Sequence, residues 1–83
     1  MASVEFKKHA LKELEELDPA IGERIVEKIF WLEKNFDVLV PERLHHELRD
    51  LYKLRVGDYR AVYSIKGNVI TIEKVRHRRE VYK

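Results

Sequence analysis

The sequence contains no cysteine among its 83 residues, and only two prolines and three glycines. Without cysteine the chain has no disulfides and no thiolate metal sites, which fits a reducing compartment such as the cytoplasm. It also lacks any run that approaches the ~20 apolar residues a membrane span needs, and its first residues have no long apolar segment after their charges. These absences predict a soluble cytoplasmic protein that does not associate with membranes.

A chain of this length leaves little room for more than one folding unit. We expect residues 1–83 to form a single domain, which buries only about 60% of the surface that its unfolded chain exposes. The stability of such a small domain is expected to be modest unless a binding partner adds to it. No internal repeat or low-complexity segment divides the chain.

Positive charge is concentrated in the second part of the sequence. From Leu51 onward there are nine basic and three acidic residues, a net charge of +6. The first fifty residues carry eight basic and twelve acidic residues, a net charge of −4. A strongly basic face points to a polyanionic partner, and a nucleic-acid backbone is the simplest candidate. A solvated surface is the alternative, since charged residues make up 39% of the chain.

The N-terminal half predicts a short strand followed by two helices. Apolar and polar residues alternate over residues 2–6, as in a strand, and apolar residues recur at helical spacing over residues 7–17 and 19–34. Asp18 and Pro19 separate the helices, with Asp18 as N-cap and Pro19 in the first turn of the second helix. A break this short predicts that the two helices pack antiparallel.

The C-terminal half predicts a small antiparallel sheet. Residues 35–46 are expected to be an irregular connector, because Pro41 prevents a continuous helix. After Leu51 the apolar residues alternate with polar ones, and the predicted strands cover residues 52–56, 59–65 and 69–75. Gly57-Asp58 and residues 66–68 form the turns between them. The predicted fold class is α+β, with an N-terminal strand and a two-helix antiparallel hairpin packed on this sheet.

Three cations are expected on one face of the predicted sheet. Lys53 and Arg55 project away from the apolar face of the first strand, and Arg60 projects beside them if the hairpin register keeps the polar faces together. Like charges directly across a ladder destabilise a sheet, so this arrangement suggests that the cations hold an anion. A solvated outer face of a one-sided sheet is the alternative.

A metal site is not expected. His45, His46 and Glu47 are metal-ligating residue types, but adjacent side chains point apart on any regular element, and no further ligand has suitable spacing. We therefore expect a protein without a metal or another cofactor.

Two segments resemble a known family. Residues 51–63 read Leu-Tyr-Lys-Leu-Arg-Val-Gly-Asp-Tyr-Arg-Ala-Val-Tyr, and residues 77–82 read His-Arg-Arg-Glu-Val-Tyr. With these segments the chain resembles the RelE/ParE superfamily of bacterial and archaeal toxins, and the RelE-like mRNA interferases in particular. The likeness extends over nearly the whole chain, including the helical half.

The resemblance implies a RelE-like, microbial-RNase-like fold and a ribonuclease that cuts mRNA in the ribosomal A site without a metal. The partners that it implies are mRNA, the ribosome and a RelB-like antitoxin that holds the toxin inactive. The protein alone is then a monomer, and with its antitoxin a hetero-oligomer. We expect the antitoxin to lay an amphipathic helix over exposed apolar surface and to offer acidic residues to the basic patch.

The resemblance also assigns roles to individual residues. The catalytic candidates are Lys53, Arg60, Arg76, His77 and Tyr82. The candidates for phosphate binding are Arg55, Arg78 and Arg79. The arginines suit phosphate because a guanidinium fork matches two phosphate oxygens and keeps its charge. Lys53 can act as a base only if the neighbouring cations favour its neutral form, and is otherwise a further electrostatic clamp. Tyr82 is expected to stack on a base or donate a proton, with docking on the core as the alternative.

One position departs from the RelE pattern. Well-characterised RelE-type enzymes have a second lysine two residues before the lysine that Lys53 matches, and this chain has Leu51 there. His77 is the candidate replacement, because imidazole titrates near neutral pH, although a surface histidine is the alternative. The missing lysine also favours ParE-like members, which share the fold and inhibit DNA gyrase. We rank the interferase first, the gyrase inhibitor second and a non-catalytic RNA-binding module third.

Overall fold

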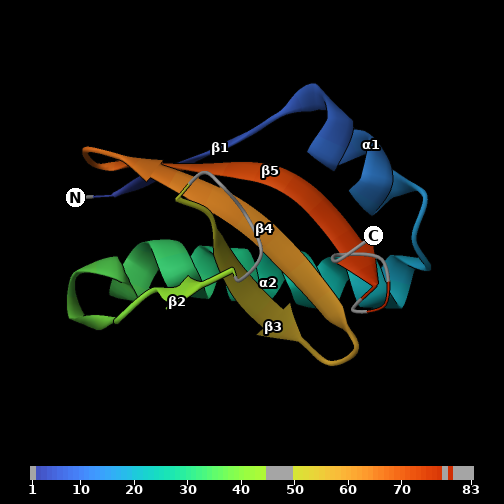
Figure 1. Cartoon of the computed structure of the whole chain (residues 1–83). Coiled ribbons are helices and arrows are strands. Elements are labelled where there is room, and N and C mark those ends of the chain that lie inside the picture. Colours follow the sequence, from blue (N-terminus) through green and yellow to red (C-terminus); the bar gives the residue numbers. More distant parts are fainter. Residues whose placement is uncertain (1, 45–49, 78, 80–83) are drawn as a thin grey trace.

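The computed structural model describes residues 2–44, 50–77 and 79, in which two α-helices and five strands follow one another (Figure 1). The helices are α1 (Lys8–Glu15) and α2 (Pro19–Asn35), and a short 3₁₀ helix, η1, spans Phe36–Val38. The strands are β1 (Ser3–Phe6), β2 (Glu42–Arg43), β3 (Tyr52–Val56), β4 (Tyr59–Lys66) and β5 (Val69–His77). The α+β class predicted from the sequence is confirmed.

The strands form one sheet in the order β1-β5-β4-β3-β2. Its centre is the predicted antiparallel meander of β3, β4 and β5. Gly57 and Gly67 lie in the two hairpin turns, each with a φ of 59°, a backbone conformation that glycine adopts without the steric cost of a Cβ atom. The two turns predicted from the sequence therefore connect the three strands of this meander.

Both outer strands differ from expectation. β1 pairs in parallel with β5, with Ser3 opposite Val69 and Phe6 opposite Ile72. The sheet is therefore mixed, because the last strand of the meander has an open edge that β1 fills. β2 lies within the segment expected to be an irregular connector, and pairs antiparallel with β3.

The main core lies between α2 and one face of the sheet (Figure 1). α2 contributes Ile25, Ile29 and Leu32, which are almost fully buried. The sheet contributes the buried residues Leu54, Ala61, Tyr63, Ile70, Ile72 and Val75. Burial of each large apolar side chain stabilises the fold by roughly 1.5–3 kcal/mol, so this layer holds α2 on the sheet.

Asp18 starts α2 as the sequence predicts. Its Oδ1 accepts a hydrogen bond of 3.0 Å from the backbone N–H of Ala20, and Pro19 is the first residue of the helix. This N-cap fixes the point at which the chain leaves α1 and turns along the sheet. No helix in the described residues is long and apolar enough to cross a membrane.

α1 packs mainly against β5 and makes only a small contact with α2 (Figure 1). Ala10 is fully buried in the main core, and Oε1 of Glu13 accepts a hydrogen bond of 2.8 Å from the backbone N–H of Val75. The two helices of the predicted hairpin therefore each pack on the sheet and contact each other only slightly. The reason is that α1, at eight residues, sits beside the part of β5 that extends past β1.

A smaller apolar cluster lies on the opposite face of the sheet. It consists of Leu44, Leu51 and Val62, each at most 5% exposed. Val62 belongs to β4, and its neighbours Ala61 and Tyr63 face the main core. The face away from α2 is therefore part apolar and part charged, and the charged part carries the candidate site.

Candidate functional site

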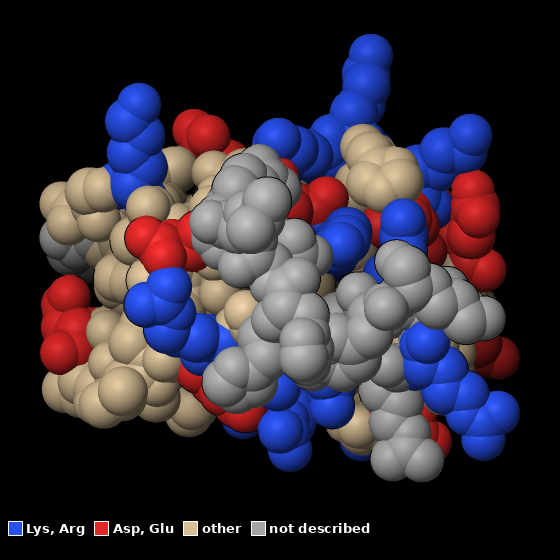
Figure 2. Space-filling model, viewed as in Figure 1, with Lys and Arg blue, Asp and Glu red and all other residues tan. Residues whose placement is uncertain are grey.

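Three arginines lie directly opposite one another on adjacent strands. Arg55 of β3 pairs with Arg60 of β4, and Arg60 pairs with Arg76 of β5. Because strand residues alternate between faces, and because Leu54, Ala61 and Val75 face the main core, all three arginines are on the face away from α2. We call them the arginine row. Figure 2 views the molecule from this side and shows basic groups with acidic groups among them.

A β-bulge brings Arg76 into this row. The β4–β5 register shifts between Val62 and Tyr63, so that Tyr63 is opposite Ile72 while Val62 is opposite Lys74. Without this shift Arg60 would pair with Val75, and Arg76 would point toward the other face. The bulge re-aims the end of β5, a common use of bulges near functional sites.

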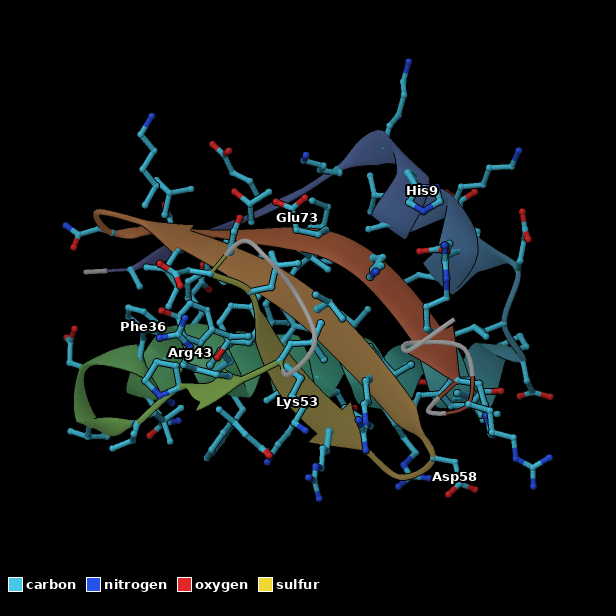
Figure 3. The ribbon with its side chains drawn as sticks, viewed as in Figure 1. His9, Phe36, Arg43, Lys53, Asp58 and Glu73 are labelled. Carbon is cyan, nitrogen blue, oxygen red and sulfur yellow. The ribbon has the colours of Figure 1, made fainter. Side chains whose placement is uncertain are left out.

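Lys53 is next to the arginine row, on the same face, and is almost buried. Its exposed fraction is 6%, and it is placed on β3 in Figure 3. The Nζ atom lies 3.8 Å from Oε2 of Glu42 on β2. Burial of a charge is tolerated when an opposite charge is near, so Glu42 supports the position of Lys53.

Glu42 also binds the first arginine of the row. Nη2 of Arg55 lies 3.2 Å from the same Oε2 atom of Glu42. One carboxylate therefore faces two cations, and its side chain is about half exposed. The β2 strand exists where the sequence gave no strand signal, so the sequence alone did not reveal this acid as part of the site.

Glu13 forms the equivalent ion pair at the other end of the arginine row. Its carboxylate pairs with the guanidinium of Arg76, and its Oε2 atom lies 3.3 Å from Nε2 of His9. His9 Nε2 is in turn 3.4 Å from Nη2 of Arg76. The sequence placed Glu13 only on the polar side of a helix, and no signal in it indicates this long-range contact.

His77 is not brought together with the arginine row. It is opposite Tyr59 at the end of β5, and the two rings are in an edge-to-face arrangement with centroids 5.4 Å apart. Its Nδ1 atom accepts a hydrogen bond of 3.3 Å from the backbone N–H of Arg79, whose side chain is exposed. Strand alternation puts His77 on the face opposite Arg76.

Other predicted site residues lie outside the described part of the chain. These are Arg78 and Tyr82, as well as the His45, His46 and Glu47 segment that was considered for a metal. Among residues 2–44, 50–77 and 79, no group of three or more potential metal ligands was found.

Leu51 is buried where RelE-type enzymes are expected to have a lysine. It is 2% exposed and packs in the smaller apolar cluster with Leu44 and Val62. The position is therefore built for an apolar side chain, and the departure from the RelE pattern extends to the packing around it.

Burial raises the pKa of Tyr63 to about 12, with smaller contributions from the nearby Tyr52 and Glu42. Tyr63 lies on the core face and stacks on Tyr52, with ring centroids 5.7 Å apart. Its phenol therefore stays protonated at physiological pH, and its role here is structural.

The arrangement suits binding of a phosphodiester more than acid–base chemistry. Three arginines on neighbouring strands project from one face, and a guanidinium group offers several hydrogen-bond donors that match phosphate oxygens. Such groups stabilise the extra negative charge that develops on phosphorus during phosphoryl transfer.

Comparison with protein families gives a match over almost the whole chain. The sequence profile of the family described as "ParE toxin of type II toxin-antitoxin system, parDE" matches residues 4–82. A search of curated protein sequences gave no match.

Solved structures show the same fold. The toxin–antitoxin complex RelBE2 from Mycobacterium tuberculosis contains a chain with 30% identity and a TM-score of 0.78, with 92% of this chain and 96% of that chain covered. The archaeal RelE–RelB complex from Pyrococcus horikoshii has 30% identity and a TM-score of 0.72, with 96% and 98% covered. The intact RelBE complex from E. coli, at 22% identity, shows likeness of fold alone, with a TM-score of 0.75 and 93% and 96% covered.

Proposed function

This chain belongs to the ParE toxin family of type II toxin–antitoxin systems, and from that premise we propose that it is a RelE-type endoribonuclease that cuts mRNA in the ribosomal A site. The observation that carries the proposal is the arginine row, three arginines opposite one another on neighbouring strands and on the same face of the sheet. Cleavage of RNA requires positive charge at the scissile phosphate, which inhibition of gyrase does not.

In the proposed reaction the ribose 2′-OH attacks the neighbouring phosphate. The bond between phosphorus and the 5′-oxygen then breaks, and the departing oxygen takes up a proton. Arg60 is at the middle of the row and is assigned to the scissile phosphate, with Arg55 and Arg76 on either side. Their positive charge stabilises the transition state without a metal ion.

The other candidate residues are given roles around the arginine row. Lys53 is assigned to charge stabilisation, because it is nearly buried and pairs with Glu42. Tyr82 is proposed to stack on a base or to donate the proton, and Arg78 and Arg79 to bind flanking phosphates. His77 is proposed as the base, which requires that the reacting 2′-OH reaches the end of β5 on the face opposite Arg76.

A RelB-like antitoxin is the proposed partner, because similar folds occur in complexes with such antitoxins. A groove between α1 and α2 is lined by apolar side chains that include Leu11 and Phe30, which are 43% and 54% exposed. We assign this groove to an amphipathic antitoxin helix, since a helix with one apolar face would cover it. Glu23 and Glu27 also line the groove, so the helix should carry basic residues beside its apolar face.

Gyrase inhibition is the second candidate, and one observation favours it. Leu51 is buried among apolar neighbours at the position where RelE-type enzymes are expected to have a lysine, and the matching family profile is that of ParE. A toxin that does not cut RNA has no need of that lysine.

The deciding experiment compares cleavage of translated mRNA with gyrase supercoiling. Cuts are mapped by primer extension on programmed ribosomes, with wild-type protein and the Arg60→Ala and Lys66→Ala variants. Lys66 is an exposed cation at the far end of β4 and serves as the matched control. We expect Arg60→Ala to lower the cleavage rate by about 100-fold, as removal of a transition-state donor does, and Lys66→Ala to retain it. Intact mRNA together with blocked supercoiling would reverse the order of the candidates.

A further inference from the structure

Each outer member of the arginine row has a carboxylate partner from an element outside the meander. Arg55 pairs with Glu42 of β2 at 3.2 Å, and Arg76 pairs with Glu13 of α1. The two acids come from opposite ends of the sheet order, one beside β3 and the other beside β5. The row is thus bracketed by an anion on each side.

These acids have two opposing effects on the row. Like charges opposite one another on neighbouring strands destabilise a sheet, and the two carboxylates offset that repulsion. They also occupy guanidinium N–H groups from which a phosphate would otherwise accept hydrogen bonds, because carboxylate and phosphate oxygens use the same donors. A backbone phosphate that binds Arg55 must displace Glu42 or share the guanidinium with it.

We propose that Glu42 and Glu13 are specificity-determining residues that limit how many backbone phosphates the arginine row binds, and so weaken binding of isolated single-stranded RNA. This inference rests on the proposed function, because it assigns the row to RNA. Its consequence is that the row contacts fewer backbone phosphates than its three cations would otherwise allow.

Glu42 is the more accessible of the two competitors. The Arg55 and Glu42 side chains are 59% and 48% exposed, so an RNA phosphate has access to both. Glu13 is only 16% exposed and also accepts the hydrogen bond from the N–H of Val75, which ties it to the fold. Replacement of Glu42 should therefore release Arg55 for RNA, and it also removes the carboxylate near the buried Lys53, so the stability of this variant is measured beside its affinity.

The test measures binding of a short fluorescein-labelled single-stranded RNA whose 2′-O-methyl riboses prevent cleavage. Fluorescence anisotropy gives Kd between about 50 and 200 mM salt for wild-type protein and for Glu42→Gln, Glu13→Gln and Asp37→Asn. Asp37 is an exposed acid of η1, beyond the C-terminal end of α2, so Asp37→Asn makes the same change in net charge away from the row. A thermal melt of each variant verifies that it is folded.

We expect Glu42→Gln to bind RNA about two- to fivefold more tightly than Asp37→Asn, the range that corresponds to loss of one exposed ion pair. The slope of log K against log salt should also steepen by about 0.7, the value for one added phosphate contact on a single strand. Glu13→Gln should act in the same direction and less strongly.

Equal affinities and equal slopes for Glu42→Gln and Asp37→Asn would overturn the inference, as would the absence of RNA binding by every variant. Neither result touches the proposed function, which depends on ribosomal cleavage and its loss in Arg60→Ala. Conversely, tighter binding by Glu42→Gln without any cleavage of mRNA on ribosomes would support an RNA-binding row and refute the nuclease.

Discussion

The carboxylate of Glu13 on α1 accepts a hydrogen bond from the backbone N–H of Val75 on β5, across 62 positions of the sequence. β1 pairs with β5 only as far as Ile72, so the edge of β5 beyond that point lacks a neighbouring strand on this side. The carboxylate takes the place of the strand carbonyl that would otherwise accept from Val75. A side chain of a short helix thus completes the sheet edge.

Removal of this acceptor should destabilise the protein. We expect Glu13→Ala to lower the free energy of unfolding by roughly 1–3 kcal/mol, because the N–H of Val75 and the guanidinium of Arg76 both lose a partner. Glu13→Gln should lose less, since its amide oxygen still accepts from Val75. Urea unfolding measures both values, and equal losses in the two variants would contradict this account of the edge.

The raised pKa of Tyr63 predicts a loss of stability in alkali. Its folded value of about 12 lies above the ordinary 10.0, so the folded state favours the neutral phenol. The stabilisation is complete below pH 10 and is lost as the pH rises toward 12, by up to roughly 3 kcal/mol. Urea unfolding at stepped pH should show this fall in wild-type protein and a smaller fall in Tyr63→Phe. Parallel curves would show that other groups cause the loss.

The N-cap of α2 gives a third prediction. Asp18→Ala removes the acceptor for the N–H of Ala20 and should cost about 1 kcal/mol of stability. Asp18→Ser keeps a capping oxygen and should retain most of it. The thermal unfolding midpoint separates the two variants, and a serine variant as unstable as the alanine variant would argue against a capping role.

Replacement of Leu51 by the lysine of RelE-type enzymes should destabilise the folded protein. Leu51→Lys places an ammonium group among Leu44 and Val62, in a cluster where the leucine is 2% exposed. We expect a loss of roughly 2–5 kcal/mol in the free energy of unfolding, whereas Leu51→Met, of similar volume, should lose less than about 1.5 kcal/mol. A Leu51→Lys variant that is stable and cuts mRNA faster would show that the pocket accepts the family's lysine.

Local patterns in the sequence were enough for the helices and the meander. Asp18 and Pro19 located the start of α2, and the predicted turn at Gly57-Asp58 allowed Arg60 to lie beside Arg55 on one face if the register kept the polar faces together, as it does. These features depend on neighbours within a few residues, where spacing and turn chemistry decide the outcome.

Features that depend on distant parts of the chain were not predicted. The partner of β1 is β5, more than sixty residues away, and no local pattern distinguishes parallel from antiparallel pairing there. The bulge can be detected in the sequence, because the spacing between apolar residues along β5 changes from two residues to three between Ile72 and Val75. That irregularity indicates that Arg76 shares a face with Arg60, a point the sequence analysis missed.

Glu42 and Glu13 were not predicted as site residues, because their contacts also depend on distant parts of the chain. Glu42 lies in a two-residue strand that is too short to show a pattern, and Glu13 looks like any other acid on a polar helix face. Their importance comes from which cations they meet in space, and that depends on the completed sheet.

The place of β5 in the sheet also affects synthesis of the protein. β5 is the last strand along the chain, yet it lies between β1 and β4 and carries Arg76. A nascent chain therefore holds β1 without its neighbour, and an incomplete row of cations, until β5 has left the exit tunnel. The arginine row is therefore assembled only after all the other described helices and strands have been synthesised.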